Sequence, residues 1–106
     1  MEFNWYQQEA VKTAVFKEDI ALAYLGLGIA NEAGEVAGKL KKVFRGDKTL
    51  EASEQAIVDE LGDVLWYVAN LADVLGYDLS QIAERNIDKL RDRKERGVIK
   101  GDGDQR

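Results

Sequence analysis

Pairs of carboxylates recur at helical spacing in the middle of this sequence. Glu60 and Asp63 are three residues apart, so they are neighbours on the surface of a helix. They border an apolar stripe that repeats every three or four residues between positions 52 and 76 and includes Ile57, Leu61 and Leu65. This period predicts an amphipathic helix that carries acidic groups beside its buried face.

A second stretch, from about 19 to 43, has a similar apolar stripe that includes Leu25, Ile29 and Val36. Glu32 occupies a position on this stripe where an apolar residue is due, and Glu35 follows one turn later. A carboxylate on a buried stripe is costly unless a counter-charge or a metal ion compensates it. Glu32 is therefore the acidic residue that is hardest to explain as an ordinary surface group.

The two stripes bring the acidic residues together if they face each other. Glu32, Glu35, Glu60 and Asp63 then converge, and four carboxylates do not all stay ionised in one place without cations. Only oxygen ligands are on offer, which suits a hard divalent ion. The sequence thus predicts a site for Mg²⁺, or for Mn²⁺, at this convergence.

The elements that must position these residues are helices. The chain of 106 residues has no proline and no alternating β-branched pattern, which predicts one all-α domain. Helices are expected from an Asn4 cap to about 15, from 19 to 45, from about 53 to 75, and from 78 to 96. Each has one apolar face, so we expect a four-helix bundle-like domain over 1–106 that ends in a Gly/Asp-rich tail, 97–106.

Composition excludes several kinds of function. A net charge of −5 argues against a nucleic-acid polymer as partner. The absence of cysteine and histidine excludes disulfides, thiolate chemistry and histidine catalysis, and it argues against a di-iron bundle, which normally uses a Glu-x-x-His motif. We see neither a signal peptide nor an apolar stretch of about 20 residues, so we expect no membrane segment and a cytoplasmic location.

The last expected helix carries a row of polar groups on its apolar side. Asn86 lies within that face, and Lys89 and Arg93 continue the same line one and two turns later. An amide flanked by two long cations can hydrogen-bond and neutralise phosphate oxygens. We refer to Asn86, Lys89 and Arg93 as the cation row.

Three segments together resemble a known family. Residues 31–35 read Asn-Glu-Ala-Gly-Glu, residues 60–63 read Glu-Leu-Gly-Asp, and residues 86–93 read Asn-Ile-Asp-Lys-Leu-Arg-Asp-Arg. In this order and spacing they look like the motifs of the MazG-like all-α nucleoside triphosphate pyrophosphohydrolases. Asn31 departs from the pattern, because many members have glutamate there; its amide oxygen can still bind a metal, with less charge.

The resemblance implies a reaction and a role for each candidate residue. The reaction is hydrolysis of a nucleoside triphosphate to the monophosphate and pyrophosphate. Mg²⁺ would lie among the carboxylates, Glu35 would accept a proton from the attacking water, and Phe16 would stack on the base. The remaining substrate-binding residues implied are Lys39, Tyr67, Asn86, Lys89 and Arg93.

Plainer interpretations exist for each feature. Glu35 and Lys39 have the spacing of a surface ion pair, and Lys89 and Arg93 lie in a mixed-charge run typical of a solvated helix. A related hydrolase of dUTP or phosphoribosyl-ATP fits the same motifs, and so does a non-catalytic oligomeric helical interaction protein. The sequence does not fix the base or the sugar of a nucleotide substrate.

Apolar residues outside the stripes predict self-association. Trp66 lies on the back of its helix with Val58 and Ala69 near it, and Trp5 and Tyr6 point to different sides of the first helix. A tryptophan buries on the order of 150–250 Å², which favours a covered position. We expect a symmetric homo-oligomer, and the resemblance favours a tetramer built as a pair of dimers. Alternatively, the first helix or the tail covers Trp66 within one chain.

Overall fold

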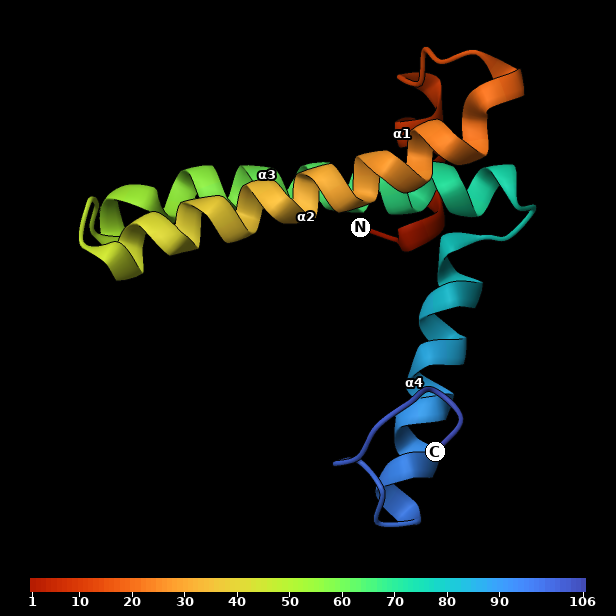
Figure 1. Cartoon of the computed structure of the whole chain (residues 1–106). Helices are drawn as coiled ribbons and strands as arrows, with labels where there is room; N and C mark the ends of the chain where they lie inside the picture. The colour runs from red at the N-terminus through yellow and green to blue at the C-terminus, as the bar shows by residue number, and fades with distance from the viewer.

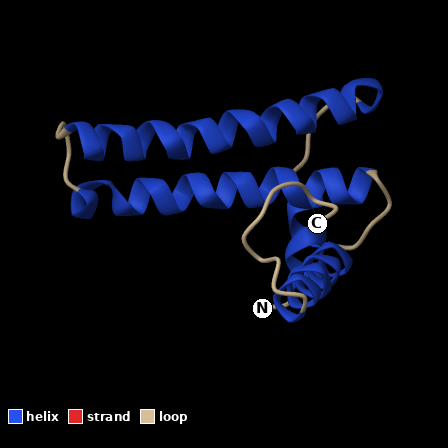
Figure 2. Cartoon of the chain, turned by 60° about the horizontal axis from the view of Figure 1, so that its bottom comes forward, coloured by secondary structure: helices blue, strands red, loops and turns tan.

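The computed structural model describes residues 1–106 and consists of helices and loops (Figures 1 and 2). The all-α prediction is therefore confirmed. The elements in chain order are α1 (Phe3–Lys12), the short 3-10 helix η1 (Glu18–Ile20), α2 (Ala21–Arg45), α3 (Leu50–Val74) and α4 (Leu79–Glu95). No helix combines the length and the apolar character needed to cross a membrane.

The two longest helices, α2 and α3, form an antiparallel hairpin (Figure 1). Gly46 ends α2 in the left-handed conformation with φ of 93°, which a residue without a side chain adopts at little cost. Thr49 caps α3, because its Oγ1 accepts a hydrogen bond from the Ala52 N–H at 3.1 Å. The break expected around 45–48 is confirmed, and α3 begins at Leu50, slightly before the predicted position.

Helix α1 forms a corner with α3 and α4. The Gln7 amide donates to the carbonyls of Ala69 and Tyr77, at 3.2 and 3.0 Å, and its oxygen accepts from the Leu79 N–H at 3.0 Å. Asn4 Oδ1 accepts from the Ser80 N–H at 3.0 Å. Asn4 thus caps α4 rather than its own helix, and α1 ends at Lys12 rather than near 15.

A small core lies at this corner. Ala10, Ala69 and Leu79 are buried, and Trp66 packs against them with Tyr6 and Val68. The Trp66 indole N–H donates to Thr13 Oγ1 at 2.7 Å. Helix α1 and Thr13, the residue after it, thus cover part of Trp66 within the chain, as in the alternative given above, and its predicted part in an oligomer contact stays a prediction.

Helix α4 leaves the corner and points away from the α2–α3 hairpin (Figure 1). It contacts α1 and α3 but not α2. The expected four-helix bundle is thus not closed within one chain, because an apolar stripe predicts that a face is covered without saying by which helix. The radius of gyration is 16.5 Å, whereas a compact chain of this length has one of roughly 13 Å.

Candidate metal centre and substrate site

The α2–α3 contact brings three of the four predicted carboxylates together. Glu32 from α2 and Glu60 and Asp63 from α3 each place one oxygen so that the three atoms lie within 4.8 Å of one another. Glu32 and Glu60 are half-buried and Asp63 is exposed. A set of carboxylate oxygens that is open to solvent on one side fits a hard divalent cation that also binds an external ligand.

The surroundings of Glu32 raise the pKa of its carboxyl. Its hydrogen bond with Glu60 raises the pKa of the Glu32 carboxyl above its ordinary value, and burial raises it further. The charges of Asp63, Glu60 and Glu35 act in the same direction. A bound divalent cation would remove this repulsion, so the protein pays an electrostatic cost that a metal ion offsets.

Glu35 lies beside this cluster but is not one of the three converging carboxylates. It is exposed on the next turn of α2, near enough for its charge to act on Glu32. From this place it can border a ligand bound to the cluster. Its predicted roles as a metal ligand and as the proton acceptor stay predictions.

The Lys39 side chain lies beside the carboxylate cluster of Glu32, Glu60 and Asp63. Its Nζ lies 3.5 Å from Glu60 Oε1, across the contact between α2 and α3, and both side chains are largely covered. Lys39 makes no ion pair with Glu35, so the plainer interpretation of an i,i+4 surface pair does not describe it. A lysine held beside the carboxylates is placed to meet the negative charge of a phosphate group.

Aromatic rings line the hairpin next to the carboxylates. Phe16 and Tyr24 are stacked with ring centroids 5.7 Å apart, and Tyr24 lies 6.1 Å from Tyr67. The Tyr67 ring also meets Trp66 edge to face at 4.9 Å. The row of rings thus starts at Phe16 and extends to Tyr67, which lies near the charges of Glu32 and Asp63. The predicted base-binding role of Phe16 stays a prediction.

Tyr67 is coupled to both the aromatic and the acidic groups. A hydrogen bond with Tyr24 raises the pKa of the Tyr67 phenol, followed by burial and by the charges of Glu32 and Asp63. Its ring lies against Gly28, where any side chain would overlap it. Tyr24 was not predicted as a site residue, although it precedes Glu35 by about three helical turns and therefore shares its face of α2.

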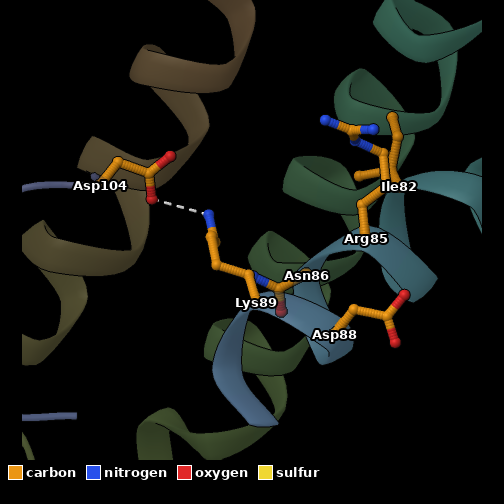
Figure 3. Close-up of a pocket in the computed structure, with 6 residues that line it drawn as sticks. All are labelled: Ile82, Arg85, Asn86, Asp88, Lys89 and Asp104. Atoms are coloured by element: carbon orange, nitrogen blue, oxygen red, sulfur yellow. Dashed lines mark hydrogen bonds and ion pairs between the residues drawn. The ribbon is translucent and has the colours of Figure 1, made fainter. Parts of the chain in front are cut away.

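The cation row lies on α4, apart from the carboxylates of its own chain. Asn86 and Lys89 line an open pocket of about 570 Å³. Figure 3 shows Lys89 pointing toward Asp104 of the tail, and Arg93 is bonded to the same residue. Because α4 makes no contact with α2, one chain does not bring the cation row to Glu32. The other pocket residues are Ile82, Arg85, Asp88 and Asp104.

Together the fold and the site define an all-α protein that holds a carboxylate cluster suited to a hard divalent cation between two antiparallel helices. The family model of the MazG nucleotide pyrophosphohydrolase domain matches residues 22–98. The chain therefore belongs to the MazG family, and the matched range includes the carboxylates and the cation row.

The chain is also similar over its whole length to a curated phage protein. The chain is 42% identical to the "Gene 37 protein" of Mycobacterium phage L5, over 114 aligned positions that cover all of both proteins. No solved structure matches the chain. Phe16 and the residues after 98 lie outside the range of the family model but inside the range shared with the phage protein.

Proposed function

We propose that the protein is a Mg²⁺-dependent nucleoside triphosphate pyrophosphohydrolase. It converts a ribo- or deoxyribonucleoside triphosphate and water into the monophosphate and pyrophosphate. The observation that carries this proposal is the convergence of Glu32, Glu60 and Asp63 in a chain that belongs to the MazG family. An interaction protein without catalysis has no need to keep three mutually repelling carboxylates at a helix contact.

The chemistry of the proposed site follows from its residues. Glu32, Glu60 and Asp63, with Glu35 beside them, would hold Mg²⁺ or Mn²⁺. When bound, the ion supplies positive charge to the phosphate oxygens and acidifies a bound water. Glu35 accepts a proton from the attacking water. The water oxygen bonds to the α-phosphorus, the bond from that phosphorus to the bridging oxygen breaks, and pyrophosphate leaves.

The remaining residues bind the substrate. Lys39 offsets charge on the phosphates beside Glu60, and the neighbouring rings of Phe16, Tyr24 and Tyr67 offer a surface for the nucleobase. This arrangement places the base at one end of the hairpin contact and the phosphates at the carboxylates. It does not select a base, so dUTP is a substrate candidate along with the other triphosphates.

The cation row completes the site from a neighbouring chain in this proposal. Asn86, Lys89 and Arg93 would bind the polyphosphate, but their helix does not approach the carboxylates of the same chain. A second copy can bring its α4 to the hairpin. The proposed active unit is therefore a homo-oligomer, and we favour a tetramer built as a pair of dimers.

An exposed apolar surface on α3 supports association. Leu61 and Leu65 lie roughly 100° and 140° around the helix from Glu60, on the side opposite to Asp63. Their exposed fractions are 52% and 37%. The flank of α3 that faces away from the carboxylate site is thus apolar and open, whereas the sequence pattern predicted that Leu61 and Leu65 lie on the buried face.

Helix α2 continues the same surface. Leu22 and Phe44 lie roughly 80° and 120° around α2 from Glu32, on the side opposite to Glu35. Both are exposed, and Phe44 has 87% of its surface accessible. Because α2 and α3 are antiparallel, these residues lie on the same side of the hairpin as Leu61 and Leu65. We call these four residues the apolar flank and propose that a second copy of the chain covers it.

Glu60→Gln tests the proposed reaction. The change keeps the size of the side chain but removes its charge, so turnover of a nucleoside triphosphate with saturating Mg²⁺ should fall by at least about 100-fold, or ~2.7 kcal/mol. Glu54→Gln, at an exposed position of the same helix, is the matched control and should leave turnover unchanged. Turnover of Glu60→Gln near the wild-type level would contradict the assignment of the site.

A further inference from the structure

The tail folds into a closed loop over α4 (Figure 1). Arg106 closes this loop: its guanidinium donates to the carbonyls of Val98 and Ile99, each at 3.1 Å, and also to that of Gly103. The Arg106 side chain packs so closely on Gly101 that a Cβ there would lie 2.8 Å from Arg106 Cδ. We call residues 98–106 the C-terminal clasp. A Gly/Asp-rich segment is thus ordered by its own hydrogen bonds.

The clasp places one carboxylate on two members of the cation row. Asp104 Oδ1 accepts from Lys89 Nζ at 2.7 Å and from an Arg93 guanidinium nitrogen at 2.9 Å. The Asp104 backbone carbonyl accepts from the same Arg93 nitrogen at 2.6 Å. Figure 3 shows the contact between Asp104 and Lys89 at the edge of the α4 pocket. Two cations that share one oxygen have the arrangement with which proteins also bind phosphate oxygens.

The burial of Arg93 limits the access of an external ligand to this residue. Only 5% of Arg93 is accessible to solvent, and its guanidinium contacts the clasp. Arg93 cannot offer the same donors to an external anion unless the clasp moves. Lys89 and Arg93 also lower the pKa of the Asp104 carboxyl through their hydrogen bonds, so it is ionised at neutral pH.

We infer that Asp104 is a built-in competitor for polyphosphate: its carboxylate occupies the place on Lys89 and Arg93 that a phosphate group takes, and ligand binding displaces the clasp. The nature of the ligand rests on the proposed function. A polyphosphate carries several charges and Asp104 carries one, so the ligand prevails at sufficient concentration. Asp104 thereby sets the substrate concentration at which the cation row is filled.

Binding of inorganic tripolyphosphate to the full chain in EDTA tests this inference without any need for turnover. Asp104→Asn keeps the shape of the side chain and removes its charge, so the dissociation constant measured by calorimetry should fall about five-fold. Asp102→Asn is the matched control, because Asp102 bonds only to the neighbouring Gly103 N–H within the loop. An unchanged or weaker affinity of Asp104→Asn would overturn the inference.

A second measurement follows displacement directly. Lys100 lies inside the clasp, so tripolyphosphate should speed tryptic cleavage at Lys100 in the wild-type chain. If saturating tripolyphosphate leaves the rate of tryptic cleavage at Lys100 unchanged, the clasp stays closed and the inference is also overturned.

Hydrolysis assays separate this inference from the proposed function. In an active enzyme, Asp104→Asn should lower KM for a nucleoside triphosphate about five-fold and leave kcat unchanged. If no nucleotide is hydrolysed but Asp104→Asn binds tripolyphosphate more tightly, the proposed function fails and the competitor role stands. If nucleotides are hydrolysed but Asp104→Asn changes neither KM nor tripolyphosphate affinity, only the competitor role fails.

Discussion

At the scale of single residues, Glu32 carries the most information about function. It lies at the contact between two long helices, where an apolar side chain would be cheaper, and Glu60 raises its pKa. Residues that break a local rule of packing in this way mark functional sites, because stability alone does not favour them. A divalent cation bound at the cluster, as we propose, would offset the cost of Glu32.

Removing this charge should stabilise the metal-free protein. In EDTA at neutral pH, Glu32→Gln should melt a few degrees above wild type, because like-charge repulsion with Glu60 and Asp63 is lost. The raised pKa of Glu32 means that its surroundings disfavour the charged carboxylate, so the folded state is destabilised only when Glu32 is ionised. The advantage of the variant should therefore disappear as pH falls below the ordinary glutamate pKa.

Mg²⁺ provides the control for this variant. It should raise the melting temperature of the wild type much more than that of Glu32→Gln, since the variant lacks one anionic ligand. Equal shifts in both proteins, or a lower melting temperature of Glu32→Gln in EDTA, would contradict the role of Glu32 in a metal site.

The carboxylates were predictable from sequence and Tyr24 was not. Helical periodicity placed Glu32 on a buried stripe and Glu60 at the edge of another, so their convergence followed from two faces meeting. Tyr24 has no such mark, because an exposed aromatic residue is common on helices. Its place became visible only in the structure, where its ring stacks on Phe16 and lies tilted against Tyr67.

At the scale of elements, the hairpin depends on a close approach of α2 to α3 at Gly28. The Tyr67 ring occupies the place where a side chain at Gly28 would lie, whereas Gly34 of the same helix has open space around it. Both glycines weaken the helix intrinsically, but only Gly28 makes room for a ring of the site.

These two glycines give a matched pair of substitutions. Gly28→Ala should destabilise the protein by about 1–3 kcal/mol, because Tyr67 must shift. Gly34→Ala should instead stabilise it by up to about 1 kcal/mol through helix propensity. Urea denaturation at one protein concentration measures both, and a Gly28→Ala variant as stable as Gly34→Ala would contradict the observed packing of Tyr67.

Local signals predicted most helix boundaries, and long-range bonds explain the misses. Gly46 and Gly97 end helices at the expected places because positive φ angles suit glycine. Asn4 and Gln7 instead bond to residues near 70–80. Such pairings have no signature in the sequence next to either partner, so the corner of α1 and the direction of α4 were not foreseen.

At the scale of the whole molecule, the single chain is extended and incompletely packed. Its radius of gyration is 16.5 Å, larger than that of a compact chain of this length. The residues of the apolar flank are exposed to water. Helix α4, which carries the cation row, points away from the α2–α3 hairpin of the same chain (Figure 1). Both features have one explanation if a second copy covers the flank and supplies its α4 to the site.

Self-association should depend on the apolar flank. Light scattering behind size exclusion should give a multiple of the chain mass of 11.9 kDa at micromolar concentration. Leu65→Glu should shift the protein to smaller species, since burying a charge in an apolar contact is costly. Leu27→Glu, at an exposed leucine outside the flank, is the control. A wild-type mass near that of one chain, or no effect of Leu65→Glu, would rule out this contact.

The proposed role of the carboxylate cluster is to support water attack at the α-phosphorus of a nucleoside triphosphate. The most direct measurement is incubation of a panel of nucleoside triphosphates with Mg²⁺ in ¹⁸O-enriched water, with products analysed by mass spectrometry. Our account predicts a nucleoside monophosphate that carries ¹⁸O, unlabelled pyrophosphate, and no reaction in EDTA. Orthophosphate and a nucleoside diphosphate as first products would contradict it.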